Sequence, residues 1–290
     1  PSDKIGSAQV ISTSGKIAGV VVEHPHATSP ATFALSTRGL TVDDTDTKLA
    51  APTIKNDFYG GTTGFSVQNT GTADALVRIT LTVTSATNSS LVGDVFTDTE
   101  VIPAGGSKVF SPFQNNLGGM PKGTFAAAVV ESLDDATYDP QLLAGTVNET
   151  NNMGKAVYTA FAQSAATTTI GVPLVKEMFY GNTTSVAVVN VGTAPTKIFA
   201  TYTDQTGTVR TFETASAIDP GAAVNFFKVY TNPGGKFTGL ANFSVLNGTK
   251  NSVSFTSDGV QPIVAIAQES DQNAADGVLD VKNFEGFAIP

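Results

Sequence analysis

The only two histidines of the chain, His24 and His26, are the first residues to test as metal ligands. They flank Pro25, and residues two positions apart in an extended strand project from the same face, so the pair could share one ion. Glu23 is the one carboxylate beside them, and two imidazoles with a single carboxylate form a poor ligand set. A solvated turn is therefore the better interpretation.

Nucleophilic catalysis has little support in the sequence. The chain contains no cysteine, which excludes thiolate nucleophiles, thiolate metal sites and disulfides. A hydrolytic triad built on either histidine would need an activated serine, yet no G-x-S-x-G elbow is present. No pair of carboxyl groups suited to glycoside hydrolysis stands out. We predict that the protein is not an enzyme.

Two groups of aspartates fall in segments that we expect to be loops: Asp43, Asp44 and Asp46, and further on Asp134, Asp135 and Asp139. Calcium takes six to eight oxygen ligands in flexible geometry, so such groups are candidate calcium sites. Neither group has the spacing of a twelve-residue EF-hand loop. We favour solvated acidic loops and expect no cofactor, with calcium as the one ion left open.

Two aromatic pairs, Phe58-Tyr59 and Phe179-Tyr180, occur in similar surroundings. Flat aromatic faces near Asn and Thr side chains can stack on sugars, which makes both pairs candidate carbohydrate platforms. Their recurrence fits core packing at least as well. We expect the phenylalanines to pack in the core or between domains, with each tyrosine hydroxyl reaching an edge.

Five N-x-[ST] sequons mark candidate glycosylation sites in segments that we expect to be exposed. They are centred on Asn88, Asn148, Asn182, Asn242 and Asn247.

An internal repeat organises the elements that carry these residues. The segment from Pro52 to Ala73 aligns with the segment from Pro173 to Ala194, at an offset of 121 positions, with 12 identities in 22 positions. The similarity continues through a Pro-Gly turn before an aromatic strand, and we therefore infer a duplicated unit. The further matches are Ile102–Gly105 with Ile218–Gly221, Gly123–Val130 with Gly239–Val245, and Leu143–Glu149 with Ile263–Glu269.

A third copy of the unit-ending strand lies near the start of the chain, at Ile17–Glu23, with no unit before it. Each copy is followed by a polar turn and a second apolar stretch, which predicts a β-hairpin. The second stretches are Ala31–Leu35, Lys155–Phe161 and Gly277–Ile289. The chain therefore reads as hairpin, unit, hairpin, unit, hairpin.

Alternation of apolar and polar residues predicts strands with one face in a core. The pattern is clear at Phe65 and Val67 and again from Leu76 to Val83. We predict an all-β chain with negligible helix, made of two tandem antiparallel β-sandwich domains of immunoglobulin-like type with an N-terminal arm and hairpin. The expected bounds are 1–50 for the arm and hairpin, 51–166 for the first sandwich and 167–290 for the second.

The composition and net charge of the chain limit the partners and the location that we expect. The net charge of −9 and the pI of about 4.6 argue against nucleic acid as a partner, because phosphate binding depends on clustered Lys and Arg. No apolar run approaches the roughly 20 residues needed to cross a bilayer as a helix. The first residue is Pro1, which agrees with removal of a leader. We expect a secreted protein, located outside the cell or on its surface.

Three motifs make the chain similar to a known group of proteins. They are the opening FYG-x-TT-x(3)-V-x-N-x-GTA, the Pro-Gly turn and the closing strand QPIVAIAQES. The chain resembles tandem immunoglobulin-like repeats of prokaryotic cell-surface, surface-layer and extracellular filament proteins, from Pro52 onward. The resemblance implies a location and an architecture, and it assigns no catalytic residue.

Two functions follow as hypotheses. The first is a structural subunit of an extracellular filament, pilus-like fibre or sheath, a homopolymer in which a strand of one subunit joins a sheet edge of the next. The second is a surface-layer or adhesin module that binds glycans or a cell-surface partner. The first predicts that a chain starting near Ala50 folds but does not polymerise. The residues expected to form the assembly arm are Ile5, Val10, Ile11, Ile17, Val20 and Val22.

Overall fold

The computed structural model describes residues 7–23, 35–114, 116–151, 154–227, 248–271 and 281–289. These residues form twenty strands and no α-helix, and every pairing between strands is antiparallel. The all-β prediction is therefore confirmed. The helical turns are short 3₁₀ segments: η1 (Val42–Asp44), η2 (Ser89–Leu91), η3 (Asn116–Gly119) and η4 (Gln163–Ala165).

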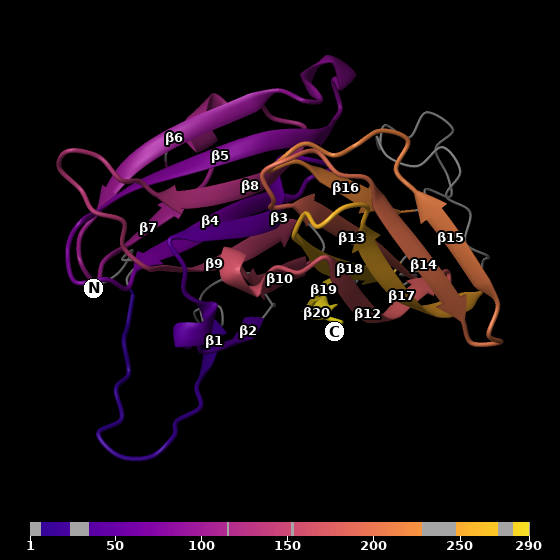
Figure 1. Ribbon diagram of the computed structural model, residues 1–290, viewed down its shortest axis with the longest axis horizontal. Helices are drawn as coiled ribbons and strands as arrows, with labels where there is room; N and C mark the ends of the chain where they lie inside the picture. Colours follow the sequence, from indigo (N-terminus) through magenta and orange to yellow (C-terminus); the bar gives the residue numbers. More distant parts are fainter. Residues whose placement is uncertain are drawn as a thin grey trace, which may run out of the picture.

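The strands from β3 to β11, which we call the first body, form two sheets (Figure 1). The five-stranded sheet has the order β11-β3-β8-β5-β6, and the four-stranded sheet has the order β10-β9-β4-β7. The bounds are β3 (Lys48–Asn56), β4 (Thr62–Asn69), β5 (Ala75–Ala86), β6 (Val95–Ile102), β7 (Ser107–Phe110), β8 (Thr124–Ser132), β9 (Leu143–Asn151), β10 (Gly154–Thr159) and β11 (Phe161–Ala162).

The strands from β12 to β20, the second body, again form a five-stranded and a four-stranded sheet. Their orders are β15-β14-β17-β12-β20 and β16-β13-β18-β19. The bounds are β12 (Thr169–Glu177), β13 (Asn182–Asn190), β14 (Ile198–Asp204), β15 (Val209–Glu213), β16 (Ala223–Phe226), β17 (Thr249–Ser257), β18 (Ile263–Asp271), β19 (Val281–Glu285) and β20 (Phe287–Ala288).

The two bodies have the same strand order when β3 is matched with β12 and each later strand with its successor. The aligned sequence segments fall on matched strands or on the connections between them, except at β8. This strand pairs Thr124 with Asn56, and its counterpart β17 pairs Thr249 with Glu177. The predicted match of Gly123–Val130 with 239–245 was therefore wrong, because a longer connection precedes β17. Residues 239–245 lie outside the described part of the chain.

In each body the two sheets enclose a cluster of buried apolar side chains. In the first body the cluster includes Leu49, Phe65 and Leu81, and in the second it includes Val186, Tyr202 and Phe255. These residues come from both sheets of their body, so burial of one face of each sheet explains the alternation seen in the sequence. Apolar burial of this kind is the main stabilising contribution to such folds.

A proline interrupts the first strand of each body at the same place. Pro52 and Pro173 lie where the pairing of β3 with β8 and of β12 with β17 shifts register. Proline has no backbone N–H and is tolerated in a sheet at such irregularities. The repeated Pro-x-x-Lys pattern therefore reflects a shared β-bulge.

The last strand of each body crosses from one sheet to the other. Strand β10 pairs with β9 in the four-stranded sheet, and after Ala160 the chain pairs with β3 as β11. Strand β19 pairs with β18, and after Gly286 the chain pairs with β12 as β20. At the crossing points, Ala160 N donates to Gly145 O and Gly286 N donates to Ala265 O. We call β9–β10 and β18–β19 the closing hairpins.

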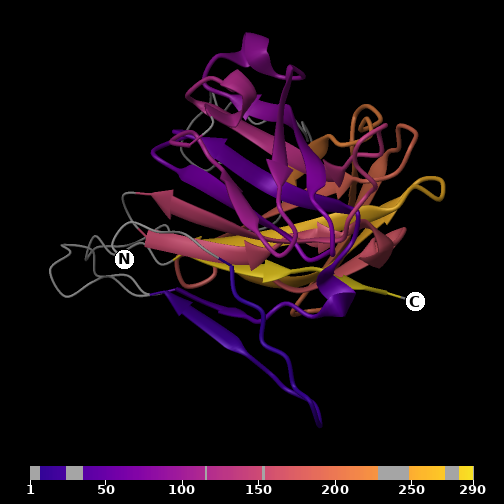
Figure 2. The same ribbon diagram turned by 90° about the vertical axis from the view of Figure 1, so that its left-hand side faces the viewer.

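The N-terminal hairpin consists of β1 (Val20–Glu23) and β2 (Leu35–Arg38), which among the described residues pair only with each other. Gly39 N donates to Gly19 O, which repeats the crossing bond of both closing hairpins. A third hairpin is therefore present, but its second strand runs from Leu35 to Arg38, and residues 31–34 of the predicted Ala31–Leu35 lie outside the described ranges. No body contains this hairpin, and in Figure 2 it stands at the margin of the molecule. Strand β2 lies against β10, and β10 lies against β19.

The bodies contact each other through an apolar interface. Ala50 and Ala127 of the first five-stranded sheet pack against Val189 and Val264 of the second four-stranded sheet and against Val191 just after β13. Ala187 and Ile266 of the same sheet are buried in the cluster of the first body. Strand β3 begins at Lys48, so the predicted boundary between residues 50 and 51 falls inside a strand.

Candidate functional sites

The N-terminal hairpin exposes an unusual amount of apolar surface. Val20, Val21 and Val22 are 71%, 58% and 60% exposed, and Ile17 is 57% exposed. The corresponding strands β9 and β18 have both edges paired, because each lies between two other strands, and Val147 and Ala267, the counterparts of Val21, are fully buried. Three consecutive exposed valines on an unpaired strand edge are a candidate docking surface.

Of the residues predicted for the assembly arm, Val10 and Ile11 are exposed in the segment that leads to β1. Ile17, Val20 and Val22 belong to or adjoin β1, so they lie together with the exposed hairpin edge. Ile5 lies outside the described residues.

Glu23 ends β1 at the position that Glu149 and Glu269 occupy in the closing hairpins. In the bodies this glutamate is buried and bonds a lysine of the body's first strand, with Glu149 Oε1 2.6 Å from Lys55 Nζ. Glu269 Oε1 lies 2.9 Å from its lysine nitrogen, Lys176 Nζ. Glu23 instead bonds Lys155 Nζ at 3.0 Å on the surface. The sequence indicated the equivalence of the three strands but not the repeated ion pair.

A polar group at the junction of the bodies was not foreseen from the sequence. Lys55 Nζ also donates to Gln268 Oε1 at 3.1 Å, and Gln268 Nε2 donates to Glu149 Oε2 at 2.9 Å and to Asn283 Oδ1 at 3.1 Å. The side chains of Lys55 and Glu149 are only 11% and 4% exposed. No spacing rule could have found this group, because its members are far apart in the chain.

The first acidic loop is occupied by contacts within the protein. Asp44 bonds both guanidinium nitrogens of Arg38, at 2.5 and 2.6 Å, and these bonds lower the pKa of the Asp44 carboxyl. Burial alone would raise the pKa of Asp46, but bonds from the backbone N–H of Ser164 and Lys48 bring it below its usual value. Asp43 is exposed.

In the second acidic loop, Asp135 Oδ1 accepts from the N–H groups of Thr137 and Tyr138, which is a local turn cap. Within the described ranges, no three His, Asp or Glu residues are placed to hold one metal ion. His24 and His26 lie outside those ranges.

The aromatic pairs sit on tight turns with an uncommon backbone. Tyr59 and Tyr180 have φ of 50° and 49°, a region that bulky residues rarely adopt. Their rings are 61% and 88% exposed, and each meets the preceding phenylalanine edge-to-face at 4.6 Å. Phe58 is buried and Phe179 is half-buried. The tyrosines therefore present their rings to solvent rather than to the core.

Three of the five sequon asparagines lie in the described ranges. Asn88 is exposed and caps η2 by accepting from Ser90 N. Asn148 is half-buried on β9, and Asn182 donates to Tyr180 O at the start of β13. Asn88 is thus the most accessible of these three. Asn242 and Asn247 lie outside the described residues.

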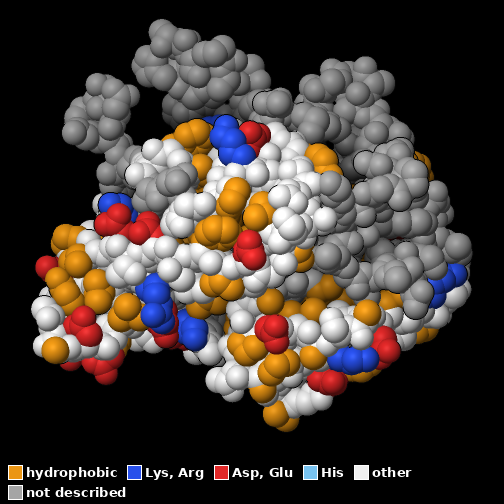
Figure 3. All heavy atoms as spheres, turned by 90° about the horizontal axis from the view of Figure 1, so that it is seen from above, with side chains coloured by type: hydrophobic (Ala, Val, Ile, Leu, Met, Phe, Trp, Pro, Cys, Tyr) orange, Lys and Arg blue, Asp and Glu red, His pale blue; other side chains and the backbone are white. Residues whose placement is uncertain are grey.

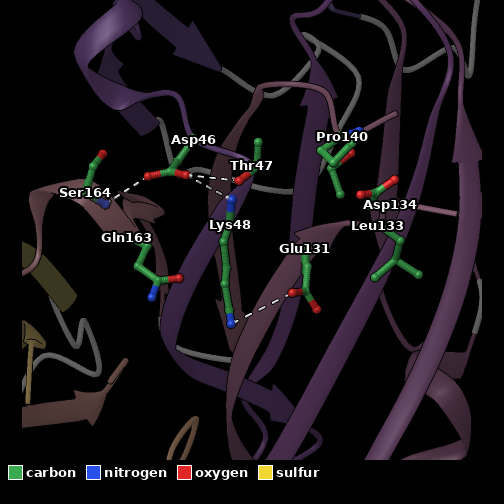
Figure 4. A pocket seen from close by; sticks show the side chains of 10 residues that line it. Asp46, Thr47, Lys48, Glu131, Leu133, Asp134, Pro140, Gln163 and Ser164 are labelled. Atoms are coloured by element: carbon green, nitrogen blue, oxygen red, sulfur yellow. Dashed lines mark hydrogen bonds and ion pairs between the residues drawn. The ribbon is translucent and has the colours of Figure 1, made fainter. Parts of the chain in front are cut away.

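An open hollow lies where β3, β8 and η4 meet (Figure 4). Asp46 accepts from the backbone N–H of Ser164 at 2.8 Å, and Lys48 Nζ lies 3.9 Å from Glu131 Oε1. Asp134 and Gln163 also line the hollow. None of these contacts joins a nucleophile to a base and an orienting group.

Charge is scattered over the face seen in Figure 3, where Lys and Arg side chains lie beside Asp and Glu. No helix in the described part of the chain is long and apolar enough to cross a membrane. A comparison with protein-family models and with curated proteins finds no match to this chain.

Proposed function

We propose that the protein is a structural subunit of an extracellular filament, pilus-like fibre or sheath, and that it assembles by strand addition between copies. The observation that carries the proposal is the N-terminal hairpin, a third closing hairpin without a body. On this proposal the two bodies are duplicated immunoglobulin-like sandwiches, the protein has no enzymatic activity, and its partner is a second copy of itself.

The exposed edge of β1 supports strand addition as the means of contact. A two-stranded hairpin is marginally stable in water, and unpaired N–H and C=O groups on an edge strand readily accept a further strand. In β9 and β18 the corresponding edge is covered by β4 and β13, each through a continuous antiparallel ladder. The internal copies therefore indicate the kind of strand that β1 lacks.

The internal copies support another copy of this chain as the source of that strand. Strands β9 and β18, the counterparts of β1, each pair with a strand of this chain, β4 and β13. A second copy contains strands of the same type. The proposed contact therefore combines main-chain hydrogen bonds with burial of the exposed valines of β1.

A matched pair of substitutions tests the proposal. Val21→Arg places a charge on the β1 edge, and Val42→Arg places the same charge on a valine of η1 that is also exposed. Neither side chain supports a core, so both variants should fold as the wild type does by circular dichroism. We expect Val21→Arg to abolish filaments in negative-stain microscopy and Val42→Arg to retain them.

A truncation gives a second arm of the test. Because Leu49 is fully buried and Asp46 bonds Ser164 N, a chain starting at Thr45 is a better choice than one starting at Ala50. It should remain folded and monomeric. Normal filaments from this chain or from the Val21→Arg variant would show that the hairpin does not carry assembly. Flat lattices from the wild type would favour a surface layer, and isolated rods an adhesin.

The second candidate is an adhesin module that binds glycans, favoured by the exposed rings of Tyr59 and Tyr180. Aromatic side chains held in a strained backbone at a turn are a feature of binding sites. Both tyrosines can be replaced by asparagine, a residue that tolerates positive φ. Glycan-array binding that is lost in the double variant Tyr59→Asn with Tyr180→Asn would support this candidate. Binding that persists in the double variant would exclude these rings as the platform.

A further inference from the structure

The polar group at the junction of the bodies brings together a buried amine, a buried carboxylate and a half-buried carboxamide. We call Lys55, Glu149 and Gln268 the junction triad. The amine touches both partners, at 2.6 Å from Glu149 Oε1 and 3.1 Å from Gln268 Oε1, and the second carboxylate oxygen bonds the carboxamide nitrogen at 2.9 Å. Each member therefore contacts the other two.

The surroundings of the triad restrict water and fix the carboxamide. The Phe125 ring centroid lies 5.8 Å from Lys55 Nζ. Asn283 Oδ1 accepts from Gln268 Nε2, so the carboxamide is held by two acceptors. Asn283 Nδ2 is buried and has no hydrogen-bond partner among the described residues. The contact of Asn283 is therefore with the nitrogen of the carboxamide, and Oε1 of Gln268 accepts from Lys55 Nζ.

We propose that the junction triad is a site of covalent modification, at which Lys55 and Gln268 form an isopeptide bond with Glu149 as the catalytic acid and base. Glu149 takes a proton from the Lys55 ammonium, and the Nζ lone pair attacks Cδ of Gln268. Lys55 Nζ already lies 3.1 Å from Gln268 Oε1, so rotation about the last side-chain bonds of Lys55 brings Nζ to Cδ of Gln268.

The reaction balances without an oxidant or a further reactant. One bond forms, between Lys55 Nζ and Gln268 Cδ, and one breaks, between Cδ and Nε2 of Gln268. Glu149 returns its proton to the leaving nitrogen through the contact that its Oε2 already makes. The products are a secondary amide and ammonia, which leaves as ammonium with the second proton of the lysine. The bond would join β3 of the first body to β18 of the second.

The second body contains a control for this chemistry. Lys176 and Glu269 form the same ion pair at 2.9 Å, but in the described part of the chain Lys176 Nζ has no carboxamide partner. The amine and carboxylate are therefore present without an acyl group. We expect one crosslink in the chain and none at Lys176.

Intact-mass spectrometry of the purified full-length chain under denaturing conditions tests the proposal, independently of filament formation. A crosslinked chain is lighter than its sequence by one ammonia, about 17 Da. Digestion should release a branched peptide that contains Lys55 and Gln268. Lys55→Arg, which keeps the charge, and Gln268→Met should restore the full mass, whereas Lys176→Arg should keep the loss.

Glu149→Gln separates catalysis from simple proximity. It keeps the size of the side chain and should slow or prevent the loss of ammonia in a chain that circular dichroism shows to be folded. Folded wild-type chain that retains its full mass after prolonged incubation would overturn the proposal. A loss of ammonia that persists in Gln268→Met, or that maps to another glutamine or asparagine, would overturn it equally.

Discussion

At the scale of single residues, three equivalent positions carry Gly19, Gly145 and Ala265, and their surroundings differ. A Cβ on Gly145 would lie 2.7 Å from Cε2 of Phe65, a fully buried ring, whereas a Cβ on Gly19 meets nothing nearer than 4.0 Å. Substitution by alanine should therefore lower the free energy of unfolding more at Gly145 than at Gly19. The glycine of the first body is required by close packing of β9 on Phe65, not by its backbone angles.

We predict that Gly145→Ala lowers the free energy of unfolding by about 1–3 kcal/mol, the usual range for overpacking a core. Gly19→Ala should change it by less than about 0.5 kcal/mol, because the site is at the surface. Urea unfolding followed by circular dichroism measures both. Equal effects of the two substitutions would mean that Phe65 moves aside at little cost.

At the scale of elements, β2 of the N-terminal hairpin lies against β10 of the first body, and the pair of Arg38 at the end of β2 with Asp44 ties the hairpin to η1, which lies against β11. The bond from Arg38 lowers the pKa of Asp44 below its usual value near 3.9. A carboxyl with a lowered folded pKa stabilises the folded arrangement above its unfolded pKa. This contribution is lost as the pH falls through the folded pKa.

We predict that hydrogen-exchange protection of β1 and β2, corrected for intrinsic rates, is constant above pH 5 and falls as the pH drops below about 4. Protection of β5 in the core should remain, because this strand does not depend on the ion pair. Asp44→Asn should show the reduced protection at every pH. A hairpin whose protection is unaffected by acid or by the substitution would have to be held by other contacts.

At the scale of the whole molecule, equivalent positions on the two four-stranded sheets differ in polarity according to what covers them. Thr146 of β9 is half-buried at the surface, whereas its counterpart Ile266 of β18 is fully buried against the first body. Ser66 and Ala187 differ in the same way. The four-stranded sheet of the second body is covered by the first body, whereas the four-stranded sheet of the first body faces outward.

We predict that Ile266→Asn lowers the free energy of unfolding by about 2–5 kcal/mol, through loss of apolar burial and an unpaired polar group in the interface. Thr146→Asn at the equivalent position should cost less than about 1 kcal/mol. Thermal unfolding of the full chain measures both. Similar costs would indicate that the interface between the bodies contributes little to stability.

The sequence by itself determined the strands and the turns, because these depend on local signals. Alternation of apolar residues located β4 and β5, and the structure then shows that the asparagine of the N-x-G-T-A motif, Asn69 or Asn190, is buried at the end of β4 or β13. In both bodies this side chain bonds two backbone carbonyls and the N–H of the next glycine, which explains why the motif recurs. The orphan hairpin could also be read from the repeat.

Only the tertiary structure decided which copy of each repeated position is buried and which side chains meet. Lys55, Glu149 and Gln268 converge because the second body packs its four-stranded sheet on the five-stranded sheet of the first. The contact between Lys55 and Gln268 spans 213 positions, and no local pattern encodes such a separation. Periodicity reports the two faces of a strand, whereas the neighbour that covers each face is set by packing between elements that are distant in the chain.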